Sequence, residues 1–398
     1  MNKLKYLILL IVPIILSGCY NYRELNDLAI TTAISIDYDK EEENFKIIAQ
    51  VINPIKEQDA TSSGEPSFIN YDSTAKTIQE AFRLVILDSP KQLYGSQVQI
   101  LILGENILDE HLPDVIDFFT REPELRSEFK VIIARGEESL DSISIQTLLD
   151  NLSSSNILDS LETQSEKLGL ASISTLNEVT NMYLNPYLEI VLPSMTVEGS
   201  IDKGESKENL TTTSNNTTTK ISTNAVFKDN KFLGYLTEEQ SKMLNIIRGD
   251  VTDTIISMDI DDGYIVFEPN KLKTSPKVTI KENKVEITIE GLAKIKEVTG
   301  KVDLTSPKEI KSLQNSLNKY LEELVSKTFE EIRDKYNTDA FKFRDLYYKE
   351  DPKYFKENDN DNWYEETFQQ LQLEVKSKIK LYEKGNTLGG IEYERENQ

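Results

Sequence analysis

The sequence has one cysteine, Cys19, and one histidine, His111, among its 398 residues. A single cysteine excludes an internal disulfide framework, and these two residues are too few soft ligands for a structural zinc ion. Composition still allows a hard-cation site made of carboxylates, although their pattern singles out none. We therefore predict no metal-binding residues.

Positive charge is scarce as well, because 45 Lys and Arg stand against 68 Asp and Glu, and the formal net charge is −23. Binding to nucleic acid requires Lys and Arg that displace counterions from phosphates, so no nucleic-acid partner is expected. The same charge opposes adhesion to anionic lipid, so any membrane attachment must be covalent or apolar. Hydrophobic residues, at 38%, still suffice for globular cores.

Catalytic and cofactor-binding motifs are missing. The sequence contains no glycine-rich phosphate loop, GxSxG elbow, HExxH, CxxC or EF-hand loop. His111 follows Asp-Glu and precedes Leu-Pro, a context typical of a surface helix rather than of a catalytic base. We predict a protein that is not an enzyme and has no catalytic or cofactor-binding residues and no cofactor. A cell-wall hydrolase that uses two carboxylates is the enzymatic alternative, because such a pair has no sequence signature.

The one long apolar run lies at the N-terminus. Two lysines in segment 1–5 precede the uncharged segment 6–16, which is typical of a signal peptide and too short to cross about 30 Å of hydrocarbon as a helix. The run ends in the letters L-S-G-C at 16–19, the pattern of a bacterial lipobox. We predict that residues 1–18 are a lipoprotein signal peptide.

Cys19 is then the predicted lipidation site, carrying a thioether-linked diacylglyceryl group and an N-acyl chain such as palmitate. Several acyl chains, at about 0.8 kcal/mol per buried CH₂, hold a protein stably on a membrane where a single chain does not. The alternative is an ordinary export signal followed by an incidental cysteine. The first interpretation makes Cys19 a membrane anchor.

Segments rich in β-formers alternate with segments of helical periodicity. Segments 28–38 and 45–52 are typical of a β-hairpin, Ser73 is expected to cap a helix, and strands are expected at 97–104 and 129–134. The length allows two or three domains. We predict an α+β fold with several domains, three in number, whose mixed or antiparallel sheets are flanked by helices.

Domain boundaries follow from composition. The Ser/Thr/Asn-rich segment 201–223 is predicted as a linker or exposed loop. Ser306 and Glu309 form a capping-box pair that opens a long helix. The remaining predicted units are an N-terminal α/β or α+β domain (19–200), a small middle hairpin-and-helix domain (224–256) and a C-terminal α+β domain (257–398) with the long helix at 307–336.

Several blocks resemble one known family. The stretch G-C-Y-N-Y-R-E-L-N-D-L-A-I at 18–30 resembles the mature start of the Ger(x)C family, the lipoprotein C subunits of bacterial spore nutrient germinant receptors, which typically have Trp where this chain has Tyr20. Similar blocks follow in the family's order. The family's D-I-x-G-F-G-like segment corresponds to D-A-F-K-F-R, where Lys and Arg replace glycines. These further blocks lie at 89–105, 118–126, 225–241 and 339–344.

The resemblance implies a non-enzymatic, lipid-anchored receptor subunit built from three α+β domains. It would assemble with two membrane-embedded subunits, A and B, at the outer face of the spore inner membrane. The receptor senses small nutrients such as amino acids and triggers germination. Whether this subunit itself binds nutrient stays open, and a solute-binding lipoprotein of a transporter is the alternative function, although the two halves of the sequence show no repeat.

The segment R-E-P-E-L-R at 121–126 is the candidate partner interface. Arg121 and Arg126 are cations in an acidic chain and, with Glu124, could meet charged groups of a partner. The alternative is that these residues only stabilise a turn.

Overall fold

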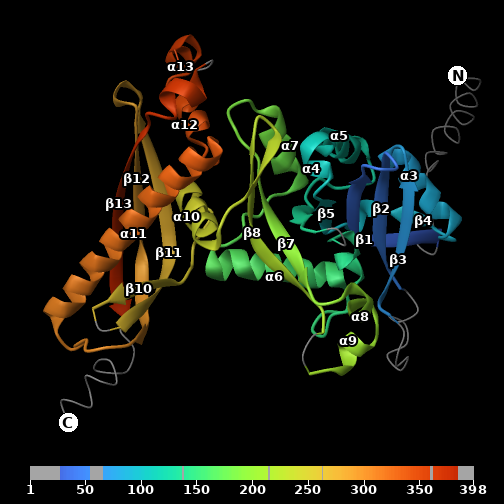
Figure 1. The fold of residues 1–398 in the computed structure, drawn as a ribbon, viewed down its shortest axis with the longest axis horizontal. Helices are drawn as coiled ribbons and strands as arrows, with labels where there is room; N and C mark the ends of the chain where they lie inside the picture. Colours follow the sequence, from blue (N-terminus) through green and yellow to red (C-terminus); the bar gives the residue numbers. More distant parts are fainter. Residues whose placement is uncertain are drawn as a thin grey trace, which may run out of the picture.

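The computed structural model describes residues 27–53, 66–136, 139–213, 216–261, 263–358 and 362–383. The predicted signal peptide and Cys19 lie outside these ranges. Within the described ranges the fold is α+β, with a nine-stranded sheet and a four-stranded sheet placed along the long axis of the molecule (Figure 1).

The nine-stranded sheet is mixed, in the order β3-β2-β1-β5-β6-β7-β8-β9, and β4 pairs with the start of β1. The central neighbours β1, β5, β6 and β7 run parallel, and the outer pairs are antiparallel. Its strands are β1 (Leu28–Asp39), β2 (Asn44–Ile52), β3 (Phe68–Ala75), β4 (Gln92–Tyr94), β5 (Ile100–Gly104), β6 (Lys130–Ala134), β7 (Val191–Glu198), β8 (Thr218–Lys228) and β9 (Lys231–Tyr235).

Both faces of this sheet are covered, which explains why β5 and β6 are continuous apolar runs. Leu101 and Leu103 face a core formed with α3, α4, α5 and α7, while Ile100 and Ile102 face a core formed with η4 and α6. The helices are α3 (Ile78–Leu84), η2 (Val85–Leu87), η3 (Gly95–Gln97), α4 (Ile107–Glu110), α5 (Leu112–Arg121), η4 (Ser139–Ser144), α6 (Ser153–Leu168), α7 (Leu176–Leu184), α8 (Ile201–Glu205) and α9 (Glu208–Thr211), the η elements being 3-10 helices.

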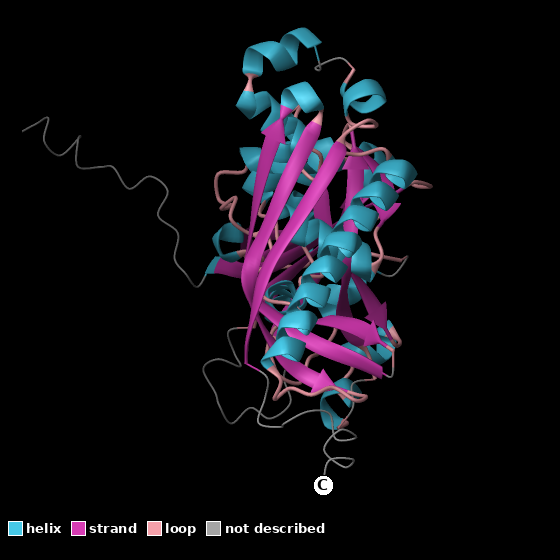
Figure 2. Cartoon of the chain, turned by 90° about the vertical axis from the view of Figure 1, so that its left-hand side faces the viewer, coloured by secondary structure: helices cyan, strands magenta, loops and turns pink. Residues whose placement is uncertain are grey.

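The four-stranded sheet has the order β10-β11-β12-β13, antiparallel except for the parallel pair β12–β13. Figure 2 shows α11 lying across one face of this sheet. The elements are α10 (Glu238–Arg248), β10 (Ile256–Ile260), β11 (Gly263–Thr279), η5 (Ile280–Glu282), β12 (Lys284–Val298), α11 (Pro307–Tyr336), α12 (Phe343–Glu350), α13 (Pro352–Asn358), the π-helical turn η6 (Trp363–Thr367) and β13 (Gln372–Glu383).

Several local predictions are confirmed. The long helix at 307–336 has the predicted bounds, and its N-cap Ser306 accepts a hydrogen bond from the Glu309 N–H at 3.3 Å. The hairpin predicted at the start of segment 224–256 is present as β8 and β9. Its turn residues Asp229 and Asn230 have φ of 49° and 64°, the left-handed pair that a two-residue type I′ hairpin requires. Local sequence signals therefore placed these helix and strand ends.

The segment 201–223 is not the linker predicted from its composition. It contains α8, α9 and the first part of β8, and β8 pairs with β7 and β9. Asn209, 0% exposed, organises the segment, because its Nδ2 donates to Gln146 and Thr217 carbonyls at 2.7 and 3.0 Å. Thr is also a good strand former, so a Thr-rich segment beside a free sheet edge becomes a strand.

The structure differs from two further predictions. The hairpin at the start of the predicted middle domain belongs to the nine-stranded sheet, and α10 packs in the core of the four-stranded sheet. Ser73 lies in β3 rather than at a helix start, and the helix begins later, with Thr77 as its N-cap. The division into three domains stays a prediction.

Candidate interaction surface and inter-domain joint

The R-E-P-E-L-R segment begins at the end of α5. The apolar face of α5 is buried against the sheet, and the helix ends at Arg121, two residues before Pro123. The turn that follows is held by Leu125, which packs so closely on Gly95 that a Cβ there would lie 2.3 Å from Leu125 Cδ2. Gly95 therefore permits this turn to rest on the sheet end.

The three predicted interface residues lie in this one turn but have different surroundings. The Nε of Arg121 donates to both carboxylate oxygens of Asp117 at 2.7 and 2.8 Å, and the Arg121 side chain is 77% exposed. Glu124 is half-buried, and its N–H donates to Glu122 Oε1 at 3.4 Å. Arg126 is exposed. Exposed ion pairs contribute only about 0–1 kcal/mol to stability, so this surface can be altered without damage to the fold.

Two adjacent hollows lie beside this turn. The first, about 260 Å³, is bounded by α3, η2, β4 and the turn and has Glu124 in its wall. The second, about 600 Å³, lies between the start of α3 and α5 and has Arg121 in its wall. Gln79, Phe118 and Glu122 border both hollows. The structure therefore brings Arg121 and Glu124 to one hollowed surface, which we call the α3–α5 surface, and leaves Arg126 outside both hollows.

His111 lies in the wall of the second hollow, at the junction of α4 and α5. Its ring lies over Tyr38, with centroids 3.7 Å apart, and meets the edge of Phe45 at 5.2 Å. Its Nδ1 is 2.9 Å from Asp114 Oδ2. Aromatic packing and this hydrogen bond hold the imidazole in place.

The described residues contain neither a metal-binding cluster nor a membrane-spanning helix. Within those ranges no three His, Cys, Asp or Glu side chains are grouped so that they could hold a metal ion. None of the helices in the described part of the chain combines the length and apolarity needed to cross a membrane.

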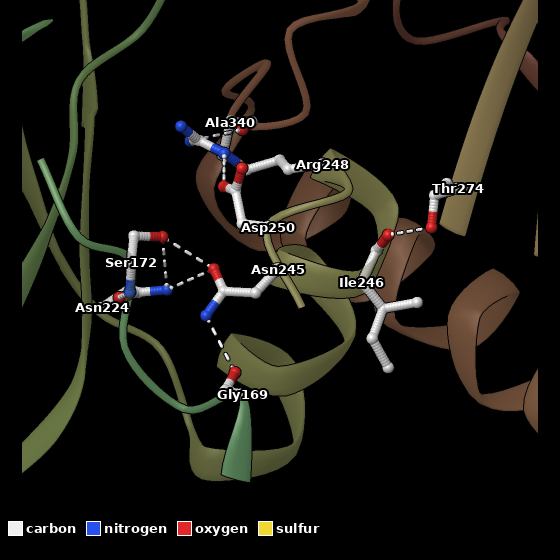
Figure 3. A network of polar contacts seen from close by, with 9 residues as sticks. All are labelled: Gly169, Ser172, Asn224, Asn245, Ile246, Arg248, Asp250, Thr274 and Ala340. Carbon is white, nitrogen blue, oxygen red and sulfur yellow. Dashed lines mark hydrogen bonds and ion pairs between the residues drawn. The ribbon is translucent and has the colours of Figure 1, made fainter. Parts of the chain in front are cut away.

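A buried polar network, absent from the sequence predictions, joins the two sheets (Figure 3). Asn245 of α10 is 1% exposed, and its Nδ2 donates to the Gly169 carbonyl at 2.9 Å. Its Oδ1 accepts from Ser172 Oγ at 2.7 Å and from Asn224 Nδ2 at 2.9 Å. On the other side of α10, Thr274 Oγ1 donates to the Ile246 carbonyl at 2.6 Å. Helix α10 therefore connects β8 and the loop before α7, on one side, with β11 on the other.

A second buried cluster crosses the same joint around Glu189. The Tyr364 hydroxyl and the Asp229 N–H both donate to its carboxylate, the latter at 2.9 Å. Asp339 is 2% exposed and accepts from the N–H groups of Phe343 and Arg344 at 3.1 and 2.5 Å. Burial raises the pKa of Glu189 and of Asp339 to about 7 each, because desolvation outweighs the hydrogen bonds.

The cations around this cluster come from both halves of the chain. Arg344 donates to the Pro186 carbonyl at 2.8 Å and lies 5.8 Å from the centroids of the Tyr187 and Tyr364 rings. Lys228 Nζ lies 4.1 Å from the Tyr364 ring centroid. An Asn within the apolar run M-L-N-I-I was the one sequence signal for this joint, since a polar residue there must find buried partners.

Comparison with known proteins identifies the family. A model described as spore germination protein N-terminal domain matches residues 21–197, and one described as spore germination B3/GerAC like, C-terminal, matches residues 222–385. The chain belongs to the Ger(x)C family. The nine-stranded sheet takes strands from both matched regions, because β8 lies largely in the second and pairs with β7 in the first.

Relatives of this Ger(x)C chain cover nearly all of it. Spore germination protein KC of Bacillus subtilis (strain 168) is 25% identical over 396 residues, which is 95% of this chain and 95% of that protein. Spore germination protein B3 of the same organism is 23% identical over 345 residues, 84% of this chain and 86% of the relative. The crystal structure of the GerBC protein matches with a TM-score of 0.53 at 18% identity, covering 87% of this chain and 96% of that one. This last match shows the shared fold.

Proposed function

We propose that this protein is a lipid-anchored, non-enzymatic subunit of a spore nutrient germinant receptor. It is held at the outer face of the spore inner membrane through Cys19 and assembles with membrane-embedded A and B subunits to trigger germination. The observation that carries the proposal is the family match over both parts of the chain, together with the L-S-G-C pattern directly before the first matched region.

The α3–α5 surface is the proposed contact with a membrane-embedded subunit. Two observations support this proposal. Arg121 and Glu124 line the hollows of the surface. The ion pair between Arg121 and Asp117 is exposed, so it can rearrange on binding at a small cost in free energy. Partner carboxylates would replace Asp117 as acceptors for the Arg121 guanidinium. Arg126, exposed at the end of the same turn, extends the contact.

The transporter alternative requires two similar lobes around a ligand cleft. The described halves differ, one having a nine-stranded mixed sheet and the other a four-stranded sheet crossed by one long helix. The fold therefore favours a receptor subunit over a two-lobed solute-binding protein.

Cys19→Ala tests the anchor. Without a thiol no thioether can form, so the variant is expected to leave the membrane fraction and to reduce nutrient germination while its circular dichroism matches that of the wild-type soluble domain. Cys19→Ser is the matched control for side-chain size and should behave in the same way. Retention of Cys19→Ala in the membrane fraction, resistant to a high-salt wash, would show that the anchor lies elsewhere.

A further inference from the structure

Two consecutive large apolar side chains are exposed at one turn of the N-terminal half. Ile86 is 49% exposed and Leu87 is 80% exposed, whereas Val85 before them is 0% exposed. The N–H groups of Asp88 and Ser89 both donate to the Val85 carbonyl, at 3.2 and 2.9 Å. Isolated exposed leucines need no explanation, but here a hydrogen-bonded turn, anchored by a buried valine, presents two apolar side chains to solvent together.

This turn, which we call the Ile86–Leu87 turn, lies beside the point where the chain enters the fold. It contacts β4, and β4 pairs in parallel with the first residues of β1, Leu28 opposite Gln92. Leu87 is five residues from Gln92, at most about 18 Å along an extended chain. In Figure 1, α3, β4 and the other early elements lie at the end of the molecule far from the four-stranded sheet.

The reach of the anchor places this end near a bilayer. Cys19 precedes Asp27 by eight residues, a distance of at most about 29 Å along the chain. An acylated Cys19 therefore keeps Asp27, and with it the start of β1, close to the membrane surface. This step rests on the proposed lipid anchor.

We propose that Ile86 and Leu87 form a second membrane contact, in which both side chains insert into the headgroup region of the lipid bilayer. Arg83 is exposed on the last turn of α3 before the pair and Lys91 is half-buried after it, while the exposed Asp88 directly follows Leu87, so the pair is flanked by two cations and one carboxylate. The long side chains of the two cations can reach lipid phosphates while Ile86 and Leu87 lose contact with water.

A lipid surface fits this turn better than a protein does. Leu87 lines neither hollow of the α3–α5 surface, and two side chains on one narrow turn supply far less than the area of about 1,200–2,000 Å² that stable protein interfaces bury. A bilayer needs no such area, because the anchor makes insertion of the turn an intramolecular event with a high effective concentration. The net charge of −23 disfavours adhesion to anionic lipid without the anchor, so the contact forms only in the tethered protein.

Two attachment points would fix the orientation of the protein on the membrane. Ile86 also borders the first hollow, as do Glu124 and Leu125. Insertion of the turn therefore holds the α3–α5 surface next to the bilayer, where a membrane-embedded partner projects.

Tryptophan quenching in vesicles tests the contact. The mature full chain, whose only thiol is Cys19, is coupled to a maleimide phospholipid in vesicles of phosphatidylcholine or brominated phosphatidylcholine. The native Trp363 is 1% exposed and gives the same background in every variant. In Leu87→Trp, brominated lipid is expected to lower the emission of the added indole by about twofold or more. Leu184→Trp is the matched control, because Leu184 is 71% exposed at the end of α7.

Equal quenching at positions 87 and 184, or none at 87, would overturn the membrane contact. Chemical coupling makes this result independent of whether cells acylate Cys19, so failure of the anchor in Cys19→Ala and failure of the turn are separate outcomes. In spores, a photoreactive residue at position 87 is expected to label lipid. Labelling of a receptor protein instead would replace the lipid contact with a protein interface.

Discussion

The α3–α5 surface and the joint between the two sheets both collect polar side chains, in opposite environments. On the surface, Arg121 and Asp117 form an ion pair with side chains 77% and 60% exposed. In the joint, Asn245 is 1% exposed and Glu189 is 6% exposed, and each has several hydrogen-bond partners. Polar groups in water contribute little to stability, whereas buried ones are costly to leave unpaired. The joint therefore fixes the relative placement of the two halves, whereas the exposed ion pair can rearrange with little effect on stability.

Asn245→Ala should have the largest effect on stability. The substitution leaves Ser172 Oγ, Asn224 Nδ2 and the Gly169 carbonyl without this partner inside the joint. We expect a loss of about 3 kcal/mol in the free energy of unfolding, measured by urea titration with the fluorescence of Trp363. Glu239→Ala, at an exposed position of the same helix, is the control and should lose less than about 1 kcal/mol. Equal losses would mean that the network does not hold the joint.

The second largest effect should be the change of the free energy of unfolding with pH. A carboxyl whose pKa is raised in the folded state binds its proton more tightly there than when unfolded. Folding stability therefore falls as pH rises from about 4 to about 7 and then levels off, for both Glu189 and Asp339. Desolvation is the largest cause of both raised pKa values. Tyr364, Asp229 and Arg344 also act on the pKa of Glu189, and the pKa of Asp339 also responds to the N–H groups of Arg344 and Phe343 and to the charge of Glu189.

Glu189→Gln isolates this effect, because the amide cannot ionise. Relative to wild type, its free energy of unfolding should increase by roughly 2 kcal/mol between about pH 5 and about pH 8. Glu124→Gln, in the turn after α5, is the matched control for replacing a carboxylate by an amide. A Glu189→Gln difference that stays constant with pH would mean that Glu189 is already ionised across this range.

The smallest effect on stability is expected on the α3–α5 surface. Arg121→Ala combined with Arg126→Ala should change the free energy of unfolding by less than about 1 kcal/mol, because both side chains are exposed. The same variant should co-purify less with the membrane-embedded subunits. Lys308→Ala combined with Lys311→Ala, two exposed cations on α11, serves as the control. Normal assembly and germination in the arginine variant would remove this turn from the interface.

Local structure was predictable where short-range chemistry decides it. Ser306 caps the long helix as predicted, and the helix has the predicted bounds 307–336. The predicted helix start at Ser73 is wrong, because a strand distant in the sequence pairs with this segment. Ser73 carries a cap-like side chain, yet its backbone pairs with Ile47 of β2, and its hydroxyl instead donates to the Ala81 carbonyl at 2.7 Å.

The candidate surface was only partly predictable. The charges of Arg121, Glu124 and Arg126 indicated the turn from the sequence. The hollows beside it depend on α3, which is about forty residues away in the sequence. Cys19 lies outside the described residues, so its lipidation stays a prediction. Helical periodicity predicts Ile86 on one apolar helix face with Ile78 and Phe82, but α3 ends at Leu84 and Ile86 is 49% exposed in the turn that follows.

The sequence by itself determined the family resemblance, the apolar leader with its lone cysteine, and the local elements, since each depends on residues a few positions apart. The tertiary structure alone decided that the end of segment 201–223 forms a strand of the nine-stranded sheet. It also decided that Asn245 and Glu189 are buried between the two sheets and that Leu87 is exposed to solvent. Burial and hydrogen bonding across the joint bring together groups from Gly169 to Tyr364, and no local pattern encodes such distant pairings.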